Sequence, residues 1–167
     1  MLAPPGGGKG TQGSRLAETL GVAHISSGDV LRAEVAAGTP LGAEVRAHLE
    51  AGRLAPDELV TRALLPALAG RDGYVLDGYP RTLAQADGLD FDAVVHLRVP
   101  DAVVERRLLA RGRTDDRPEV IAQRLRQYGE DTQPLIDFYR ERGVLLSVDG
   151  TRPMDEIAAD LAARLKP

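Results

Sequence analysis

The stretch "APPGGGKGTQ", from Ala3 to Gln12, decides the fold. Glycine reaches backbone conformations that other residues avoid, and it lets the chain approach a bound group closely. A glycine loop that leads into a helix can therefore surround an anion with backbone N–H groups at the positive end of that helix. Pro4 and Pro5 lack this donor, so we expect them to shape the entry to the loop. An ordinary flexible turn is the alternative, because Ala3 stands where the usual pattern has a glycine, six residues before the lysine.

The composition limits the class of protein. A chain of 167 residues with 43% hydrophobic residues is expected to form one domain with a full core. Its net charge of -4 argues against nucleic acids and anionic membranes as partners. The absence of cysteine excludes disulfides, thiolate zinc sites and cysteine nucleophiles. Because no long apolar run or signal-peptide pattern appears, we expect a cytoplasmic protein.

The lysine in the loop stands out from the other basic residues. Of the 21 basic residues only Lys9 and Lys166 are lysines. Arginine is a planar fork, whereas lysine is a compact charge that can follow a phosphoryl group during transfer. The position of Lys9 therefore favours a role at a phosphate.

Short apolar stretches alternate with helical patterns along the chain. We expect strands at 22–26, 73–80, 92–99 and 143–150, and helices at 11–20, 101–111, 118–142 and 153–165. This alternation predicts an α/β fold with a central parallel sheet covered by helices on both faces. Residues 28–70 contain three helical segments with no strand between them, which predicts an all-helical insertion.

A second motif, "LDGYPRT", covers Leu76 to Thr82. Asp77 follows a buried strand and is expected to face the glycine loop, where a carboxylate can hold water on a magnesium ion. Arg81 comes four residues later and can reach a phosphate with a bidentate contact. A β-turn capped by the aspartate is the alternative.

A set of arginines forms the third motif: Arg107, Arg111, Arg113 and Arg124. The first two share one face of a predicted helix, and the polar loop 112–118 joins that helix to the next one, so the four can converge on one cleft. Alternatively they are solvated surface residues, or they form weak ion pairs with Asp115 and Asp116.

Four segments in this order and spacing resemble the adenylate kinase family: "PGGGKGTQ", "ISSGDVLR", "LDGYPRTLAQA" and "RGRTDDRPEVIAQRL". The resemblance covers almost the whole chain. It implies reversible phosphoryl transfer from Mg-ATP to AMP, giving two ADP, by a monomer. It also implies a P-loop three-layer sandwich with a five-stranded parallel sheet. Residues 1–167 would form a single domain, with a monophosphate-binding insertion at about 26–55 and a minimal lid at about 112–117, too short to hold zinc.

The resemblance also assigns site residues. The catalytic set is Lys9, Arg81, Arg111, Arg113 and Arg124. The implied ATP-binding residues are Gly6, Gly7, Gly8, Lys9, Gly10, Thr11, Arg107, Arg111 and Arg152. The implied AMP-binding residues are Ser27, Arg32, Arg53, Leu54, Ala55, Gly78, Tyr79, Pro80, Arg81, Gln85, Arg113 and Arg124. Asp77 is implied to hold Mg²⁺ through water.

Two other functions stay open. A UMP/CMP kinase is disfavoured by Ser27, since the resemblance suggests that pyrimidine kinases carry alanine there, and by Gln85, which can pair with both edges of adenine. The second alternative is a nucleotide-binding protein without catalytic activity, because Ala3 replaces a glycine and the first strand is missing.

The start of the chain departs from the family pattern. Relatives have an apolar strand before the loop, whereas this chain has only Met1 and Leu2. Loss of about three buried apolar side chains would cost roughly 5–9 kcal/mol, which is comparable to the stability of a typical domain. We therefore expect that a few apolar residues belong before Met1.

Overall fold

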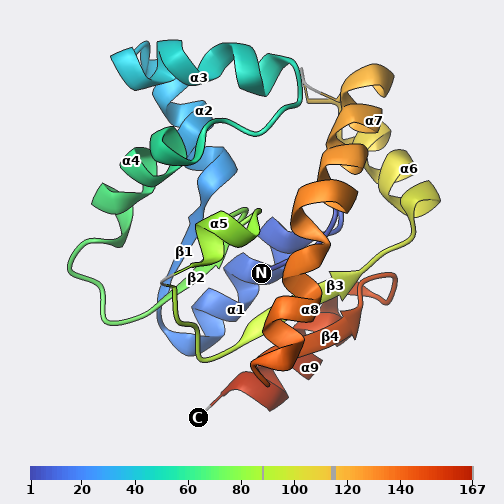
Figure 1. The fold of residues 1–167 in the computed structure, drawn as a ribbon. Coiled ribbons are helices and arrows are strands. Elements are labelled where there is room, and N and C mark those ends of the chain that lie inside the picture. The colour runs from blue at the N-terminus through green and yellow to red at the C-terminus, as the bar shows by residue number, and fades with distance from the viewer. Residues whose placement is uncertain (88, 114–115, 167) are drawn as a thin grey trace.

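In a computed structural model the protein has a mixed helix and strand fold (Figure 1), described for residues 1–87, 89–113 and 116–166. The strands are β1 (Ala23–Ser26), β2 (Tyr74–Asp77), β3 (Val94–Arg98) and β4 (Leu145–Asp149). The helices are α1 (Lys9–Leu20), α2 (Ser27–Ala37), α3 (Pro40–Glu50), α4 (Asp57–Leu68), α5 (Leu83–Ala86), α6 (Asp101–Arg111), α7 (Pro118–Gln127), α8 (Pro134–Glu141) and α9 (Met154–Leu165). A π-helical turn, Tyr128–Thr132, connects α7 to α8.

The strands form two parallel pairs. Strand β1 pairs with β2, and Ile25 lies opposite Leu76. Strand β3 pairs with β4, and Leu97 lies opposite Val148. The four predicted strands and their parallel direction are confirmed, but the described residues form two two-stranded sheets and not one continuous sheet.

The segment before the glycine loop lies between the two pairs. The Leu2 N–H donates to Val95 O at 2.7 Å, and the Leu97 N–H donates to Leu2 O at 2.9 Å, which makes a parallel bridge to β3. On the other side, the Met1 nitrogen donates to Leu76 O of β2 at 2.8 Å. Met1 and Leu2 therefore partly occupy the place where the sequence led us to expect a missing strand.

Successive side chains of this segment point to opposite faces, as they do in a strand. Leu2 is 4% exposed and packs with a cluster that includes Tyr139 of α8. Ala3 is 3% exposed and packs with a different cluster, which includes Leu16 of α1 and Leu161 of α9. The two faces of the strands are thus covered by different helices.

Helices α2, α3 and α4 follow one another between β1 and β2, and residues 27–73, all described, contain no strand. Figure 1 shows these helices as a group on one side of the strands. Ser26 Oγ accepts from the Asp29 N–H at the start of α2, and Thr39 Oγ1 accepts from the Gly42 N–H in α3. Such caps fix helix starts, so the predicted all-helical insertion is present.

The predicted helical stretch over 118–142 is present, but it is not one regular α-helix. Helix α7 ends at Gln127, and a π-helical turn separates it from α8. In this turn the Gln133 N–H donates to Tyr128 O at 2.8 Å, which is the wider π spacing. Pro134 has no N–H group, so a regular α-helical ladder cannot continue through it.

We expect Leu2→Ala to lower the free energy of unfolding by at least about 2 kcal/mol, because it leaves a cavity beneath α8. The matched control is Leu65→Ala on α4, where the leucine is 60% exposed, and its cost should stay below about 0.5 kcal/mol. Urea unfolding of both variants measures the difference. Equal costs would show that the Leu2 side chain does not contribute to the core.

Candidate active site

The glycine loop has the backbone that an anion site needs. Gly6 and Gly8 have φ of 74° and 94°, in the left-handed region that favours glycine. Gly8 is the N-cap of α1, and the first turn, whose residues are all described, contains no side-chain cap and no acidic residue. The helix N-terminus therefore remains available to an anion. None of the described non-glycine residues has a positive φ, so Ala3 stands without strain where the usual pattern has glycine.

The Lys9 side chain turns back toward the loop. Its Nζ donates to Ala3 O at 2.9 Å and to Pro4 O at 3.2 Å. Burial, together with the positive charge of Arg81, lowers the pKa of Lys9 to about 7, although the Asp77 carboxylate partly opposes this. A phosphate in the loop would offer the ammonium group a charged acceptor in place of the two carbonyl groups.

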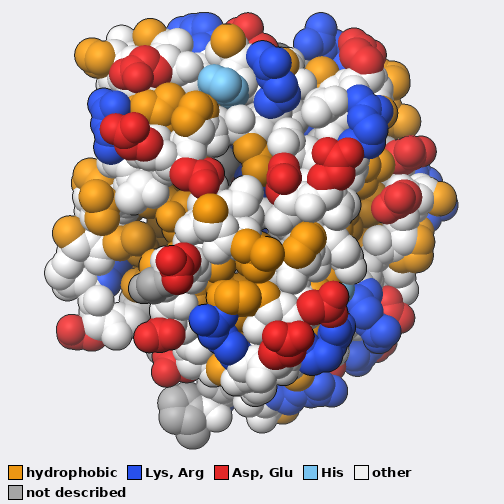
Figure 2. All heavy atoms as spheres, in the orientation of Figure 1, with side chains coloured by type: hydrophobic (Ala, Val, Ile, Leu, Met, Phe, Trp, Pro, Cys, Tyr) orange, Lys and Arg blue, Asp and Glu red, His pale blue; other side chains and the backbone are white. Residues whose placement is uncertain are grey.

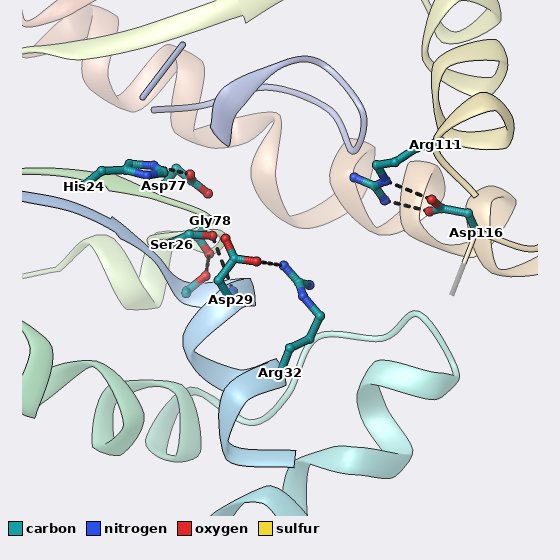
Figure 3. A network of polar contacts seen from close by, with 9 residues as sticks. His24, Ser26, Asp29, Arg32, Asp77, Gly78, Arg111 and Asp116 are labelled. Carbon is teal, nitrogen blue, oxygen red and sulfur yellow. Dashed lines mark hydrogen bonds and ion pairs between the residues drawn. The ribbon is translucent and has the colours of Figure 1, made fainter. Parts of the chain in front are cut away.

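Asp77 ends β2 beside the first turn of α1. Its Oδ2 lies 2.7 Å from His24 Nε2 of β1, and Figure 3 shows the two side chains pointing toward each other. The sequence does not single out His24, since a lone histidine in a short strand carries no pattern. A β-turn capped by Asp77 does not account for this contact, and the imidazole holds the carboxylate in place beside the loop.

The same carboxylate is the candidate contact for a magnesium ion. Among the described residues no three His, Asp or Glu side chains come together as a metal site. One carboxylate beside a phosphate loop still fits Mg²⁺, which keeps several waters and takes its remaining oxygens from nucleotide phosphates. The residues present thus fit a metal that arrives with the nucleotide.

Asp116 organises the arginines. Its carboxylate accepts two hydrogen bonds from Arg111, at 2.8 and 2.7 Å (Figure 3). It also accepts one from the Arg113 N–H at 3.1 Å. Arg124 Nη1 lies 3.5 Å from the same carboxylate. Burial alone would raise the pKa of Asp116, but these hydrogen bonds outweigh it and hold the pKa below its usual range.

The alternative of weak surface ion pairs therefore does not hold for Asp116, whose side chain is fully buried. Asp115, the other acidic residue considered there, lies outside the described residues. In the sequence, the one indication that Asp116 contacts the arginines is its position in an acidic pair between two arginine-bearing helices. Charge alone could not tell that the Asp116 carboxylate is buried.

Arg107 and Arg152 lie near the end of β4. Arg107 Nη2 donates to Gly150 O at 3.1 Å. The Arg152 guanidinium instead contacts helix α9, which begins two residues later, with Nη1 3.1 Å from Asp160 Oδ2. The Arg152 side chain therefore points away from the loop, and only its backbone remains as a candidate contact.

Most predicted site residues line two cavities. The first, here called the phosphate cavity, is lined by Gly6, Gly8, Lys9, Gly10, Thr11, Arg32, Asp77, Arg81, Arg107, Arg111, Arg113 and Arg124, among others. The second, here called the insertion cavity, is lined by Ser27, Arg32, Arg53, Leu54, Ala55, Gly78, Arg81, Gln85 and Arg124, among others. The predicted residues that line neither cavity, all of them described, are Gly7, Tyr79, Pro80 and Arg152.

The two cavities meet at shared arginines. Arg32, Arg81 and Arg124 line both of them. Arg81 is oriented by its own turn, since its Nε donates to Gly78 O at 2.7 Å, and the same oxygen accepts from the Ser27 hydroxyl at 2.6 Å. The turn after β2 is thereby tied to the start of α2.

Two anion-binding spaces joined by common arginines can hold two phosphate groups at once. Such a site defines a phosphotransferase that acts between two phosphorylated substrates. The comparisons with known proteins agree with this class. The family model for adenylate kinase matches residues 1–144.

Similar proteins carry the same description over nearly their full length. An adenylate kinase of Stenotrophomonas maltophilia (strain R551-3) is 46% identical over 182 positions, which cover 99% of this chain and 97% of that protein. One from Synechococcus sp. (strain WH7803) is 47% identical over 177 positions, covering 99% and 96%. Adenylate kinase 1 of Synechocystis sp. is 44% identical over 179 positions, covering 100% and 96%. The chain belongs to the adenylate kinase family, and the resemblance predicted from its motifs is confirmed.

Asp116→Asn should lower kcat for ADP formation from ATP and AMP by at least about tenfold, because Arg111 and Arg124 lose the charge that positions them. Asp137→Asn is the matched control, since Asp137 forms an exposed ion pair with Arg140 on α8. It should leave kcat unchanged. Steady-state kinetics of both variants make the comparison, and equal values of kcat would remove Asp116 from the site.

We expect ATP binding at pH 8 to take up protons. At this pH most Lys9 is neutral in the free protein, since its pKa is about 7, and a bound phosphate raises that pKa and protonates the amine. At pH 5 the amine is already charged, so its contribution disappears. Calorimetry in two buffers of different ionisation enthalpy measures the uptake. Uptake that persists in Lys9→Met would assign the proton to another group.

Proposed function

We propose that this adenylate kinase transfers the terminal phosphoryl group of Mg-ATP directly to AMP at the junction of the two cavities, giving two ADP. The observation that carries the proposal is that Arg81 and Arg124 line both cavities. A cation between two phosphate sites reduces the repulsion between the reacting anions and stabilises charge in the transition state. No protein nucleophile is needed, because the AMP phosphate is itself the nucleophile.

The residue roles follow from this arrangement. The loop from Gly6 to Thr11 would hold the ATP phosphates, with Lys9 at the transferring group. Arg111 and Arg113 would stabilise the charge on that group, and Asp77 would hold a water of the magnesium ion. Arg107 and the backbone at Arg152 would contact the ATP side.

The insertion cavity is the proposed AMP site. Ser27, Arg32 and Arg81 would bind toward the monophosphate, and Arg53, Leu54, Ala55 and Gln85 toward the base. The turn formed by Gly78, Tyr79 and Pro80 would position these groups. Apolar residues that line the same cavity, among them Leu31 and Val60, support this assignment because a base needs an apolar surface to lie against.

We further propose that the two strand pairs belong to one central sheet of a three-layer sandwich. The bonds of Met1 and Leu2 to β2 and β3 support it. In this single domain, residues 26–55 would form the monophosphate-binding part and 112–117 the minimal lid, of which Thr114 and Asp115 lie outside the described residues. The alignment with the Stenotrophomonas maltophilia relative has 182 positions, whereas this chain has 167 residues, which supports internal segments that are shorter than in that relative.

We propose that the protein is a cytoplasmic monomer and that its partners are small molecules. No described helix is long and apolar enough to cross a membrane. On the face shown in Figure 2, Lys and Arg side chains are interspersed with Asp and Glu. This mixed charge favours small substrates over nucleic acid as partners.

Two alternatives are less well supported. A UMP/CMP kinase would need a base site for pyrimidines, but Ser27 retains its hydroxyl group and Gln85 lines the cavity. A protein without catalytic activity was suggested by Ala3 and by the short start of the chain. Ala3 fits without strain, and Leu2 pairs with β3, so neither feature now argues against activity.

Lys9→Met should lower kcat by at least ~10²-fold while the protein stays folded, because it removes charge at the transferring phosphate. The other lysine of the chain provides the control, since Lys166 is exposed near the C-terminal end. Lys166→Met should keep full activity. A coupled assay with ATP and AMP measures both variants, and more than half the activity in Lys9→Met would refute the proposed role.

A further inference from the structure

The Gln85 side chain is held at both ends of its carboxamide. The residue is 6% exposed. Its Oε1 accepts from the Arg81 N–H at 2.7 Å, and its Nε2 donates to Asp57 Oδ1 at 2.5 Å. Asp57 begins α4, whereas Gln85 lies on α5, so this contact joins the helical insertion to α5.

These two partners allow only one orientation of the amide. A backbone N–H is always a donor, and an ionised carboxylate is always an acceptor. Rotating the amide by half a turn would place the Gln85 NH₂ against the Arg81 N–H and its oxygen against the Asp57 carboxylate. Both contacts would then be repulsive, so the positions of Oε1 and Nε2 are fixed.

One donor and one acceptor remain on Gln85 after these bonds are made. The second N–H of Nε2 and the second lone pair of Oε1 are available, and Gln85 lines the insertion cavity. Adenine presents an acceptor at N1 and a donor at its 6-amino group. Hypoxanthine and guanine present the reverse, a donor at N1 and an acceptor at O6. An amide that cannot rotate can match only one of these two patterns.

We propose that Asp57 is a specificity-determining residue that makes the monophosphate site select a 6-aminopurine over a 6-oxopurine by preventing rotation of the Gln85 amide. The inference rests on the proposed function in one respect, namely that the base of the monophosphate lies against Gln85. Asp57 is a positioning residue here, since it acts on the base only through Gln85.

A structural role for Asp57 is the competing explanation. Asp57 and Glu58 both stand in the first turn of α4, where acidic residues stabilise the helix dipole. Both residues are exposed. Glu58→Gln therefore removes an equivalent charge from the same turn, and no described hydrogen bond links Glu58 to Gln85, which makes it the matched control.

The test is calorimetric binding of AMP and of inosine monophosphate to the unaltered protein, Asp57→Asn and Glu58→Gln. Inosine monophosphate has the 6-oxopurine pattern without the 2-amino group of guanine, so it isolates the hydrogen-bond pattern from steric effects. An asparagine at position 57 can donate or accept, so it no longer opposes the rotated orientation of Gln85. Asp57→Ala is a second variant that also removes the fixed acceptor.

The unaltered protein should bind AMP at least about tenfold more tightly than inosine monophosphate, because a mismatched base leaves polar groups unpaired. Asp57→Asn and Asp57→Ala should each narrow this ratio about fivefold, since one of the two repulsive contacts is removed. Glu58→Gln should leave the ratio unchanged, and the ATP affinity should be equal in all four proteins.

An unchanged ratio in both Asp57 variants, or equal narrowing in Glu58→Gln, overturns the inference. If the unaltered protein binds AMP but does not phosphorylate it, the proposed function fails, while the binding ratio still decides the role of Asp57. If the unaltered protein does not bind AMP, both fail.

Discussion

The repulsion between four like charges is the constraint on which the rest of the structure depends. The cations come from four separate elements: Lys9 from α1, Arg81 from the turn after β2, Arg111 from α6 and Arg124 from α7. Burial and neighbouring positive charge lower the pKa of Lys9 to about 7 and that of Arg81 to about 10. The carboxylates of Asp77 and Asp116 offset part of this charge. A bound phosphate would neutralise the remaining positive charge, so the fold positions these cations to bind an anion.

The fold places the proposed site of base selection next to the proposed site of phosphoryl transfer. Ala3 lies beside the bridge that Leu2 makes to β3, and its carbonyl oxygen accepts from Lys9. The strand arrangement and the position of the Lys9 side chain therefore depend on the same few residues. In the proposed site the base is selected elsewhere, by Gln85, which is held between Asp57 at the start of α4 and the Arg81 backbone. Arg81 connects the two, since its backbone orients the amide and its side chain lines the phosphate cavity.

Local patterns in the sequence were enough to predict most of the fold. Glycine and proline positions and the apolar stretches predicted all four strands and the helical insertion, because these features act over a few residues. The π-helical turn at Tyr128–Thr132 was not predicted, since it depends on tertiary contacts such as that between Thr132 Oγ1 and Arg81 O. Within the site, the loop and the arginines carry recognisable spacing. No recognisable spacing marks His24, Asp57 or Asp116. Each of them acts through a partner distant in the sequence or through its burial, and neither property can be read from spacing.

Direct transfer between two bound nucleotides is the central claim, and initial-rate kinetics with ATP and AMP both varied test it most directly. If both substrates must occupy adjoining cavities, double-reciprocal plots at several fixed AMP concentrations intersect. Parallel lines would indicate that a phosphorylated form of the protein is made before AMP binds. That result would contradict a site in which Arg81 and Arg124 hold both phosphate groups at the same time.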